Sequence, residues 1–196
     1  AEYEPDPVIA RTYGGGALAS DGGKLYWGTM HVPGTGALAI AATYGQSDTA
    51  REALATVLGS TRAISIFRGD NFDKPRKRSV ELLYGAAKLP VYDGARWTLQ
   101  PNAMGGVRPR YGPSGFGNAF NNYTWTMATY DGGLYVGTMD WSYLVASGAS
   151  SLIGSALEDR LGARVDAGAV RRALGGGTSG AGRQRTLGYG ADLWRF

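Results

Sequence analysis

The sequence DGGKLYWGTM at residues 21–30 recurs as DGGLYVGTM at residues 131–139. The second copy is one residue shorter in the turn, and five of the six strand residues after it are identical. Tyr26 and Tyr135 occupy the same place in the two copies and are 109 residues apart. A repeat of this kind indicates that one structural unit occurs twice in the chain.

Each copy combines a tight turn with the β-strand that follows it. Asp-Gly-Gly supplies the positive φ angles that a hairpin turn needs, and the aliphatic and aromatic residues behind it favour a short strand. Because side chains alternate between the faces of a strand, Leu134 and Val136 should face one side and Tyr135 and Gly137 the other. A glycine inside such a strand, as at Gly28, indicates the close approach of another backbone.

Further β-prone segments flank both copies at matching places. One precedes each turn, at residues 14–20 and 123–130, and one follows each copy after an insertion, at residues 63–68 and 191–196. The later pair share an aliphatic-aromatic-Arg triplet, which is Ile-Phe-Arg in the first copy and Leu-Trp-Arg in the second. The first copy continues into a fourth strand at residues 79–84, for which the second copy has no counterpart.

Four antiparallel strands in a meander are the unit of a β-propeller blade. We therefore predict an all-β fold with helical insertions, a β-propeller fragment of about two four-stranded antiparallel blades with the second incomplete. Blade 1 spans about residues 9–84 with an insertion at 31–62. Blade 2 spans about residues 123–196 with an insertion at 140–190, and residues 85–122 connect the blades.

Helical patterns are present in both insertions. In the first, residues 49–52 (TARE) form a capping box, an apolar stripe follows, and Gly59 can end the helix. In the second, an apolar face over residues 150–161 ends at a glycine, and Asp166 can cap a further helix through Leu174. In a meander, the insertions and the inter-blade connection emerge at one end of the blades and the short turns at the other. Function is therefore expected at the end with the long loops.

The Asp-Gly-Gly turn with Leu-Tyr-x-Gly-Thr, together with Leu-Trp-Arg at residues 193–195, resembles the blade motifs of bacterial secreted β-propeller proteins. The resemblance covers about half of the chain and is specific for architecture. It implies a bacterial protein that is secreted, periplasmic or attached to the cell surface. It does not identify a function, because propellers serve binding, catalysis and scaffolding alike.

Composition excludes several classes of protein. The chain has 32 glycines, no cysteine and a formal net charge of +4. Disulfides and thiolate metal sites are therefore ruled out, and no apolar stretch reaches the roughly 18 residues of a membrane helix. The one dense basic cluster, at residues 74–78, is typical of a solvated loop. We expect neither a membrane span nor a nucleic-acid partner.

The incomplete ring predicts a partner. Two blades cannot close a propeller, which needs about four to eight, and repeat units cannot bury their apolar faces alone. We expect either a second polypeptide, from the same precursor or from another, or a homo-oligomer. The chain is accordingly predicted to be a non-catalytic scaffold or interaction subunit of a secreted or cell-surface assembly. The alternatives are a carbohydrate- or peptide-binding propeller and an enzyme whose site is shared between chains.

Candidate site residues lie where the long loops leave the strands. His31, the only histidine, follows the first repeat and could act as a general base or a ligand, with a structural histidine as the alternative. At the equivalent place in the second copy, Asp140, Trp141 and Tyr143 offer an acid and two aromatic rings. Such a group suits a sugar or peptide ligand, or else the packing of the insertion onto the blade.

Two further polar groups are candidates. The glycine-rich loop before residue 123 carries three amides that could bind a ligand or bond to the loop's own backbone, Asn118, Asn121 and Asn122. Oxygen ligands for Ca²⁺ are offered by Asp70, Asn71 and Asp73. The spacing of this trio lacks the pattern of a calcium loop, and no other cofactor is predicted. No nucleophile-base motif is present in the sequence.

Overall fold

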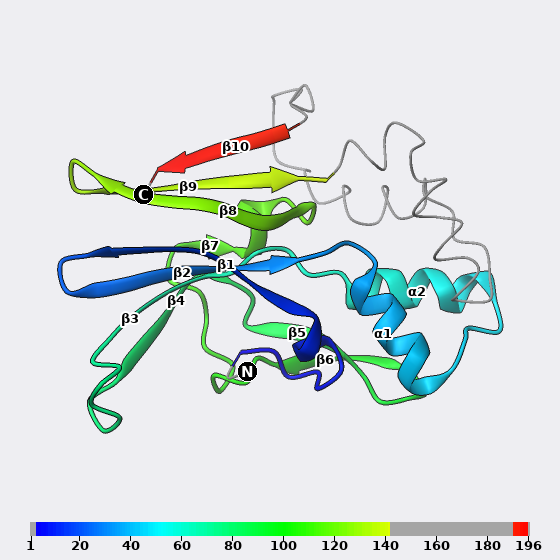
Figure 1. The fold of residues 1–196 in the computed structure, drawn as a ribbon. Coiled ribbons are helices and arrows are strands. Elements are labelled where there is room, and N and C mark those ends of the chain that lie inside the picture. Colours follow the sequence, from blue (N-terminus) through cyan, green and yellow to red (C-terminus); the bar gives the residue numbers. More distant parts are fainter. Residues whose placement is uncertain (1–2, 142–189, 196) are drawn as a thin grey trace.

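The computed structural model describes residues 3–141 and 190–195 (Figure 1). The fold is mostly β with two helices, and its main sheet curls into a half-barrel. The strands are β1 (Tyr13–Asp21), β2 (Lys24–His31), β3 (Ile66–Asp70), β4 (Ser79–Gly85), β5 (Lys88–Tyr92), β6 (Trp97–Pro101), β7 (Gly112–Pro113), β8 (Asn121–Tyr130), β9 (Gly133–Asp140) and β10 (Gly190–Arg195). The helices are α1 (Thr35–Tyr44) and α2 (Ala50–Ser60). The predicted all-β class with helices is confirmed.

Both sequence repeats form antiparallel meanders. Strands β1 to β4 pair in order, and so do β8, β9 and β10. The aliphatic-aromatic-Arg triplets have the same register: Ile66 lies opposite Gly28, and Leu193 lies opposite Gly137. Each triplet arginine lies opposite the tyrosine of its own copy. The strands predicted from the repeat are therefore confirmed, and β10 corresponds to β3.

The two meanders join where β2 meets β8. The strands pair at Met30 and Tyr123, and β1 lies alongside β8. Thr124 fills the space over two glycines of the first meander. A Cβ built on Gly28 would lie 2.3 Å from Thr124 Cγ2, and a Cβ on Gly16 would lie 1.8 Å from Thr124 Oγ1. The close approach expected at Gly28 is present, but a side chain makes it and not a backbone.

A β-bulge interrupts the first strand of each meander. The register of β1 against β2 shifts between Gly15 and Leu18, and the register of β8 against β9 shifts between Thr124 and Thr126. In both cases the shift faces the glycine in the middle of the repeat strand. Bulges bend a strand and increase its twist, so the repeated bulge contributes to the curl of the sheet seen in Figure 1.

Helix α2 begins as predicted and ends later than predicted. Thr49 Oγ1 accepts a hydrogen bond of 3.2 Å from the Glu52 amide, and Glu52 Oε2 accepts one from the Asp48 amide. Gly59 does not end the helix, because α2 continues to Ser60. A Cβ on Gly59 would lie 2.4 Å from the Trp97 ring, so the glycine serves packing. Helix α1 was not predicted, because its run of small residues has no clear apolar stripe.

The segment predicted as a plain connection, residues 85–122, contains a second sheet. β5 and β6 form an antiparallel hairpin. Asp93 Oδ1 accepts hydrogen bonds from the amides of Ala95 and Arg96 at 2.9 and 2.8 Å, which fixes the turn in the way typical of aspartate. The hairpin and the N-terminal segment cover one side of the first meander, where Tyr3, Phe67, Leu82 and Leu89 form a buried cluster.

The ends of the strands differ in what they carry. Figure 1 shows the β1–β2, β3–β4 and β8–β9 turns at one end of the sheet and both helices at the other. This is the arrangement expected of the first insertion, at residues 31–62. The helices predicted for the second insertion lie outside the described residues. The blade boundaries stay a prediction.

Candidate functional site

The candidate asparagines and Asp140 lie at the helix end of the sheet, and each asparagine side chain forms hydrogen bonds there. Asn118 Nδ2 donates to Asp140 Oδ2 at 3.0 Å. Asn121 is fully buried, and its side chain accepts from Thr138 Oγ1 at 3.3 Å and donates to the Gly115 carbonyl at 3.1 Å. These bonds fix the loop before β8 against the end of β9. The three amides thus bond to groups inside and outside the loop, and ligand binding by them stays a prediction.

Asn122 connects this loop to a buried ion pair. Its amide Nδ2 donates to the carbonyl oxygen of Arg62, which is the residue that follows α2 and its cap. The Arg62 guanidinium binds Glu4 at both carboxylate oxygens, with Nε to Oε2 at 2.7 Å and Nη2 to Oε1 at 3.1 Å. It also donates to the carbonyls of Gly59 and Pro90 at 2.7 Å each. Both charged side chains are buried, so this pair ties the N-terminal segment to α2 and β5.

The ion pair extends to His31 through Tyr13. The Tyr13 hydroxyl donates to Glu4 Oε2 at 2.8 Å, and the Tyr13 ring meets the His31 ring edge-on with 3.8 Å between the centroids. Burial, followed by the negative charge of Glu4, raises the pKa of Tyr13 well above its ordinary value of 10.0. Burial and then the positive charge of Arg62 lower the pKa of His31 from 6.5 to about 3. His31 is therefore neutral at physiological pH, and Tyr13 keeps its proton.

His31 thus lacks the properties of a general base that works near neutral pH. Such a base needs a pKa close to the working pH and access to a substrate, whereas His31 is buried. Its Nε2 atom is buried without a hydrogen-bond partner among the described residues. The sequence indicated His31 but not Glu4 and Arg62, because isolated charged residues far apart in a sequence are usually exposed. Nothing in the sequence indicated that Tyr13 lies between His31 and this pair.

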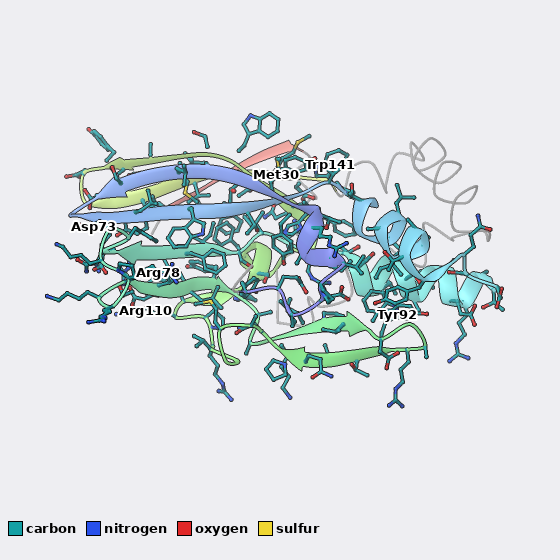
Figure 2. All side chains as sticks on the ribbon, turned by 60° about the horizontal axis from the view of Figure 1, so that its bottom comes forward. Met30, Asp73, Arg78, Tyr92, Arg110 and Trp141 are labelled. Carbon is teal, nitrogen blue, oxygen red and sulfur yellow. The ribbon has the colours of Figure 1, made fainter. Side chains whose placement is uncertain are left out.

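Trp141 packs on β8. Its ring stacks on Tyr123 at 5.5 Å with 20° between the planes, and its amide donates to the Phe120 carbonyl at 3.0 Å. Figure 2 places Trp141 near Met30, whose strand pairs with Tyr123. Ligand binding by this group and packing of the insertion onto the blade both stay predictions. Tyr143 lies outside the described residues.

The calcium candidates lie at the opposite end of the sheet, with Asp70 at the end of β3 and Asn71 and Asp73 in the β3–β4 turn. Asp70 Oδ2 lies 3.2 Å from the Lys24 ammonium, and Asp70 Oδ1 accepts from Ser79 Oγ at 2.6 Å and from Asn71 Nδ2 at 3.0 Å. The Ser79 hydroxyl and then Lys24 hold the pKa of Asp70 below its usual value. Asp73 is paired with Lys74 at 3.8 Å. Within residues 3–141 and 190–195, no three acidic or histidine side chains gather as a metal site would require.

A hollow of about 220 Å³ lies between the two meanders near their turns. Three tyrosines and an arginine line it, Tyr26, Tyr84, Tyr111 and Arg68. The arginine is held by Glu81 at 2.7 Å, and Glu81 in turn binds Arg110 at 2.8 Å. Figure 2 shows Arg110 at the same end as Arg78 and Asp73 of the basic loop. The sequence did not indicate this hollow, because its wall comes from segments far apart in the chain: β1 to β4, the residue before β7, β8, β9 and the β8–β9 turn.

One face of the second meander is open to solvent. Leu193 is 71% exposed, whereas Ile66, at the same place in the first meander, is 0% exposed. Tyr130 is 74% exposed and its ring lies 6.5 Å from that of Tyr135. The guanidinium of Arg195 lies 5.8 Å from the Tyr135 ring. We call the surface formed by Tyr130, Tyr135, Leu193 and Arg195 the open face.

Comparison with family models, with curated proteins and with solved structures gave no match to this chain. Among the described residues, no helix has the length and apolar character needed to cross a membrane.

Proposed function

We propose that this chain is a non-catalytic scaffold or interaction subunit, which completes a β-propeller with a further chain that packs on the open face. The observation that carries the proposal is the contrast between Ile66 and Leu193. The two residues have the same cross-strand partner in their repeats, yet one is 0% and the other 71% exposed.

The first meander shows how the position equivalent to Leu193 is covered when another meander packs on it. Ile66 is buried because the second meander packs over it, with Met127, Leu134 and Val136 in the same apolar cluster. The equivalent position on the second meander, Leu193, has no such cover among the described residues. Exposed apolar patches of this kind mark interaction surfaces, and a third unit that packs like the second would cover it.

The far side of the first meander is already occupied. Phe67 and Leu82 are buried there under Tyr3 and Leu89 of the same chain. The partner is therefore expected at the open face, not at both sides of the sheet pair. The buried ion pair of Glu4 and Arg62 supports a scaffold role as well, because its groups hold three chain segments together.

Native mass spectrometry of the chain purified without denaturation from its source tests this proposal. The expected result is a complex heavier than the 20.6 kDa chain, which denaturation separates into this chain and a second polypeptide. Copies of this chain alone would indicate the homo-oligomer instead. A monomer that does not associate at roughly 50 μM, well above common affinities, would overturn the proposal.

Two matched variants locate the contact. Leu193→Asp places a charge on the open face and should release the partner. Leu99→Asp is the control, because Leu99 is 67% exposed but lies on β6, away from the open face. Loss of the complex in both variants, or in neither, would contradict the assignment to the open face.

A second candidate is the binding of a peptide or carbohydrate in the hollow between the meanders. The observation that favours it is the tyrosine lining, since Tyr84 and Tyr111 present rings beside the Arg68–Glu81 pair. Aromatic faces with a few fixed polar groups are typical of such sites. A glycan and peptide array tests it. Signals that vanish in Tyr111→Ala and persist in Leu99→Asp would support binding there.

A further inference from the structure

The outer edge of β10 corresponds to the outer edge of β3, which is paired with β4 of the same chain. β3 and β10 occupy the same place in the two meanders. In the first meander, β4 pairs antiparallel with β3 along its outer edge. In the described part of the chain, no strand pairs with the outer edge of β10, which lies at the free border of the sheet (Figure 1). Unpaired strand edges are templates for the addition of a strand.

The β3–β4 pair defines the residues that such a strand needs. Leu82 lies opposite Phe67, and Glu81 lies opposite Arg68. Glu81 Oε2 accepts from Arg68 Nε at 2.7 Å, and the pairing with Arg68 keeps the pKa of Glu81 below its usual value. A carboxylate opposite the triplet arginine is thus one of the polar side-chain contacts that join the third and fourth strands of the first meander, beside the Ser79–Asp70 bond.

Arg195 is the counterpart of Arg68 and has no carboxylate partner among the described residues. Its guanidinium lies over the Tyr135 ring at 5.8 Å, and its side chain is exposed. Opposite charges directly across an antiparallel pair stabilise it. Arg195 therefore complements a strand that carries an acid at the position that Glu81 holds in β4.

We propose that the edge of β10 receives an antiparallel strand from a second, different polypeptide, with a carboxylate opposite Arg195 and an aliphatic residue opposite Trp194. The inference rests on the proposed function and specifies how the partner attaches. A second copy of this chain does not fit as donor, because its own β4 is held in place by β3 and has Leu82 buried in the core.

Hydrogen exchange with the full chain and a synthetic peptide of residues 77–87 tests the proposal. The peptide contains β4 with its acid and serves as a stand-in for the partner strand. We expect exchange of the β10 amides to slow as the peptide is added. A peptide with Glu81→Lys should bind about threefold more weakly, the effect of one cross-strand charge pair.

Swapping the two opposite charges between the chain and the peptide gives the decisive comparison of binding strengths. A chain with Arg195→Glu should reverse the preference and bind the Glu81→Lys peptide more tightly than the original peptide. Equal binding of both peptides, or slowed exchange at a site other than β10, would overturn the proposal.

Joining the peptide to the chain covalently allows the test even if the free peptide has too low an affinity to bind. Adding the peptide sequence to the C-terminus through a flexible linker raises its local concentration to the millimolar range. We expect the thermal midpoint to rise by about 3 °C or more, and the rise to disappear when the tethered copy carries Glu81→Lys. An unchanged midpoint with the original sequence overturns the proposal.

The two tests fail separately. A complex that depends on Leu193, with no response of β10 to the peptide or its tethered form, would leave the scaffold function standing and remove the strand addition. A charge-dependent response of β10 in a chain that forms no complex would leave the strand addition standing and remove the scaffold function.

Discussion

Thr124 Oγ1 on β8 donates a hydrogen bond of 2.8 Å to the backbone carbonyl of Thr29 on β2, 95 residues earlier in the chain. The bond joins the two meanders where they share a single paired position, Met30 with Tyr123. Thr124 is buried and sits over Gly16 and Gly28. A short polar side chain on one repeat and two glycines on the other therefore set the distance between the units.

Removing this hydroxyl should weaken the contact between the meanders. Thr124→Val keeps the shape of the side chain but leaves the Thr29 carbonyl without this donor, at a cost of about 1–2 kcal/mol in the free energy of unfolding. Urea denaturation measures the loss. Thr129→Val is the matched control, because its hydroxyl lies 3.5 Å from the Ser20 carbonyl in an exposed position. Equal losses in the two variants would refute the special role of Thr124.

A methyl group in the place of the Gly28 hydrogen should separate the meanders. The new Cβ would lie 2.3 Å from Thr124 Cγ2 and 2.7 Å from its Cβ, so we expect Gly28→Ala to lower the free energy of unfolding by about 1–3 kcal/mol. Gly15→Ala is the control on the neighbouring strand, since nothing lies within 4 Å of its Cβ. Chemical denaturation of both variants decides the matter, and an unaffected Gly28→Ala would show that the units have room to shift.

The Glu4–Arg62 pair should contribute far more than a surface pair. Glu4→Gln leaves a buried guanidinium without its counter-charge, which typically costs about 3–5 kcal/mol. Lys24→Met breaks the partly exposed pair with Asp70 and should cost less than about 1 kcal/mol. Thermal and urea unfolding compare the two. A similar small effect of both substitutions would mean that Arg62 finds other partners when Glu4 is neutral.

Stability should fall in acid because of His31. Its pKa is about 3 in the folded protein and 6.5 when exposed, so the unfolded chain binds the proton first. The contribution of His31 to the free energy of unfolding is complete above its unfolded pKa of 6.5. It decreases as the pH falls from there toward about 3. We expect a loss of about 2 kcal/mol between about pH 7 and about pH 5.

The variant His31→Phe isolates this effect. Phenylalanine retains a ring against Tyr13 and cannot titrate, so the difference in unfolding free energy between the variant and the original chain should change over this pH interval. Parallel pH profiles for the two proteins would show that His31 is protonated equally in the folded and unfolded states.

The strands could be predicted because each copy of the repeat encodes its turn and strand in neighbouring residues. Each Asp-Gly-Gly turn and the strand behind it are encoded within about ten residues, and the triplets that end in Arg68 and Arg195 identify the third strand of each unit. Turn glycines and β-prone residues act through their own backbone and side-chain preferences. The capping box of α2 is local in the same way.

The candidate site was predicted only in part. His31, Asp140 and the asparagines lie at the helix end of the sheet, where Asp140 and the asparagines form hydrogen bonds within the chain and the His31 ring packs against Tyr13. Their partners include Arg62, which the sequence gave no reason to choose. The position of a buried charge depends on which distant segments meet there, and no pattern in the sequence reports that meeting.

The sequence by itself determined the repeat unit, its strand order and the correspondence of Ile66 with Leu193, because these follow from backbone preferences and spacing along the chain. Only the tertiary structure decided that Ile66 is covered and Leu193 is exposed, that Glu4 reaches Arg62, and that no carboxylate within residues 3–141 and 190–195 pairs with Arg195 as Glu81 pairs with Arg68. Burial and charge pairing arise from packing between segments distant in sequence. The two members of one repeated motif can therefore have opposite surroundings.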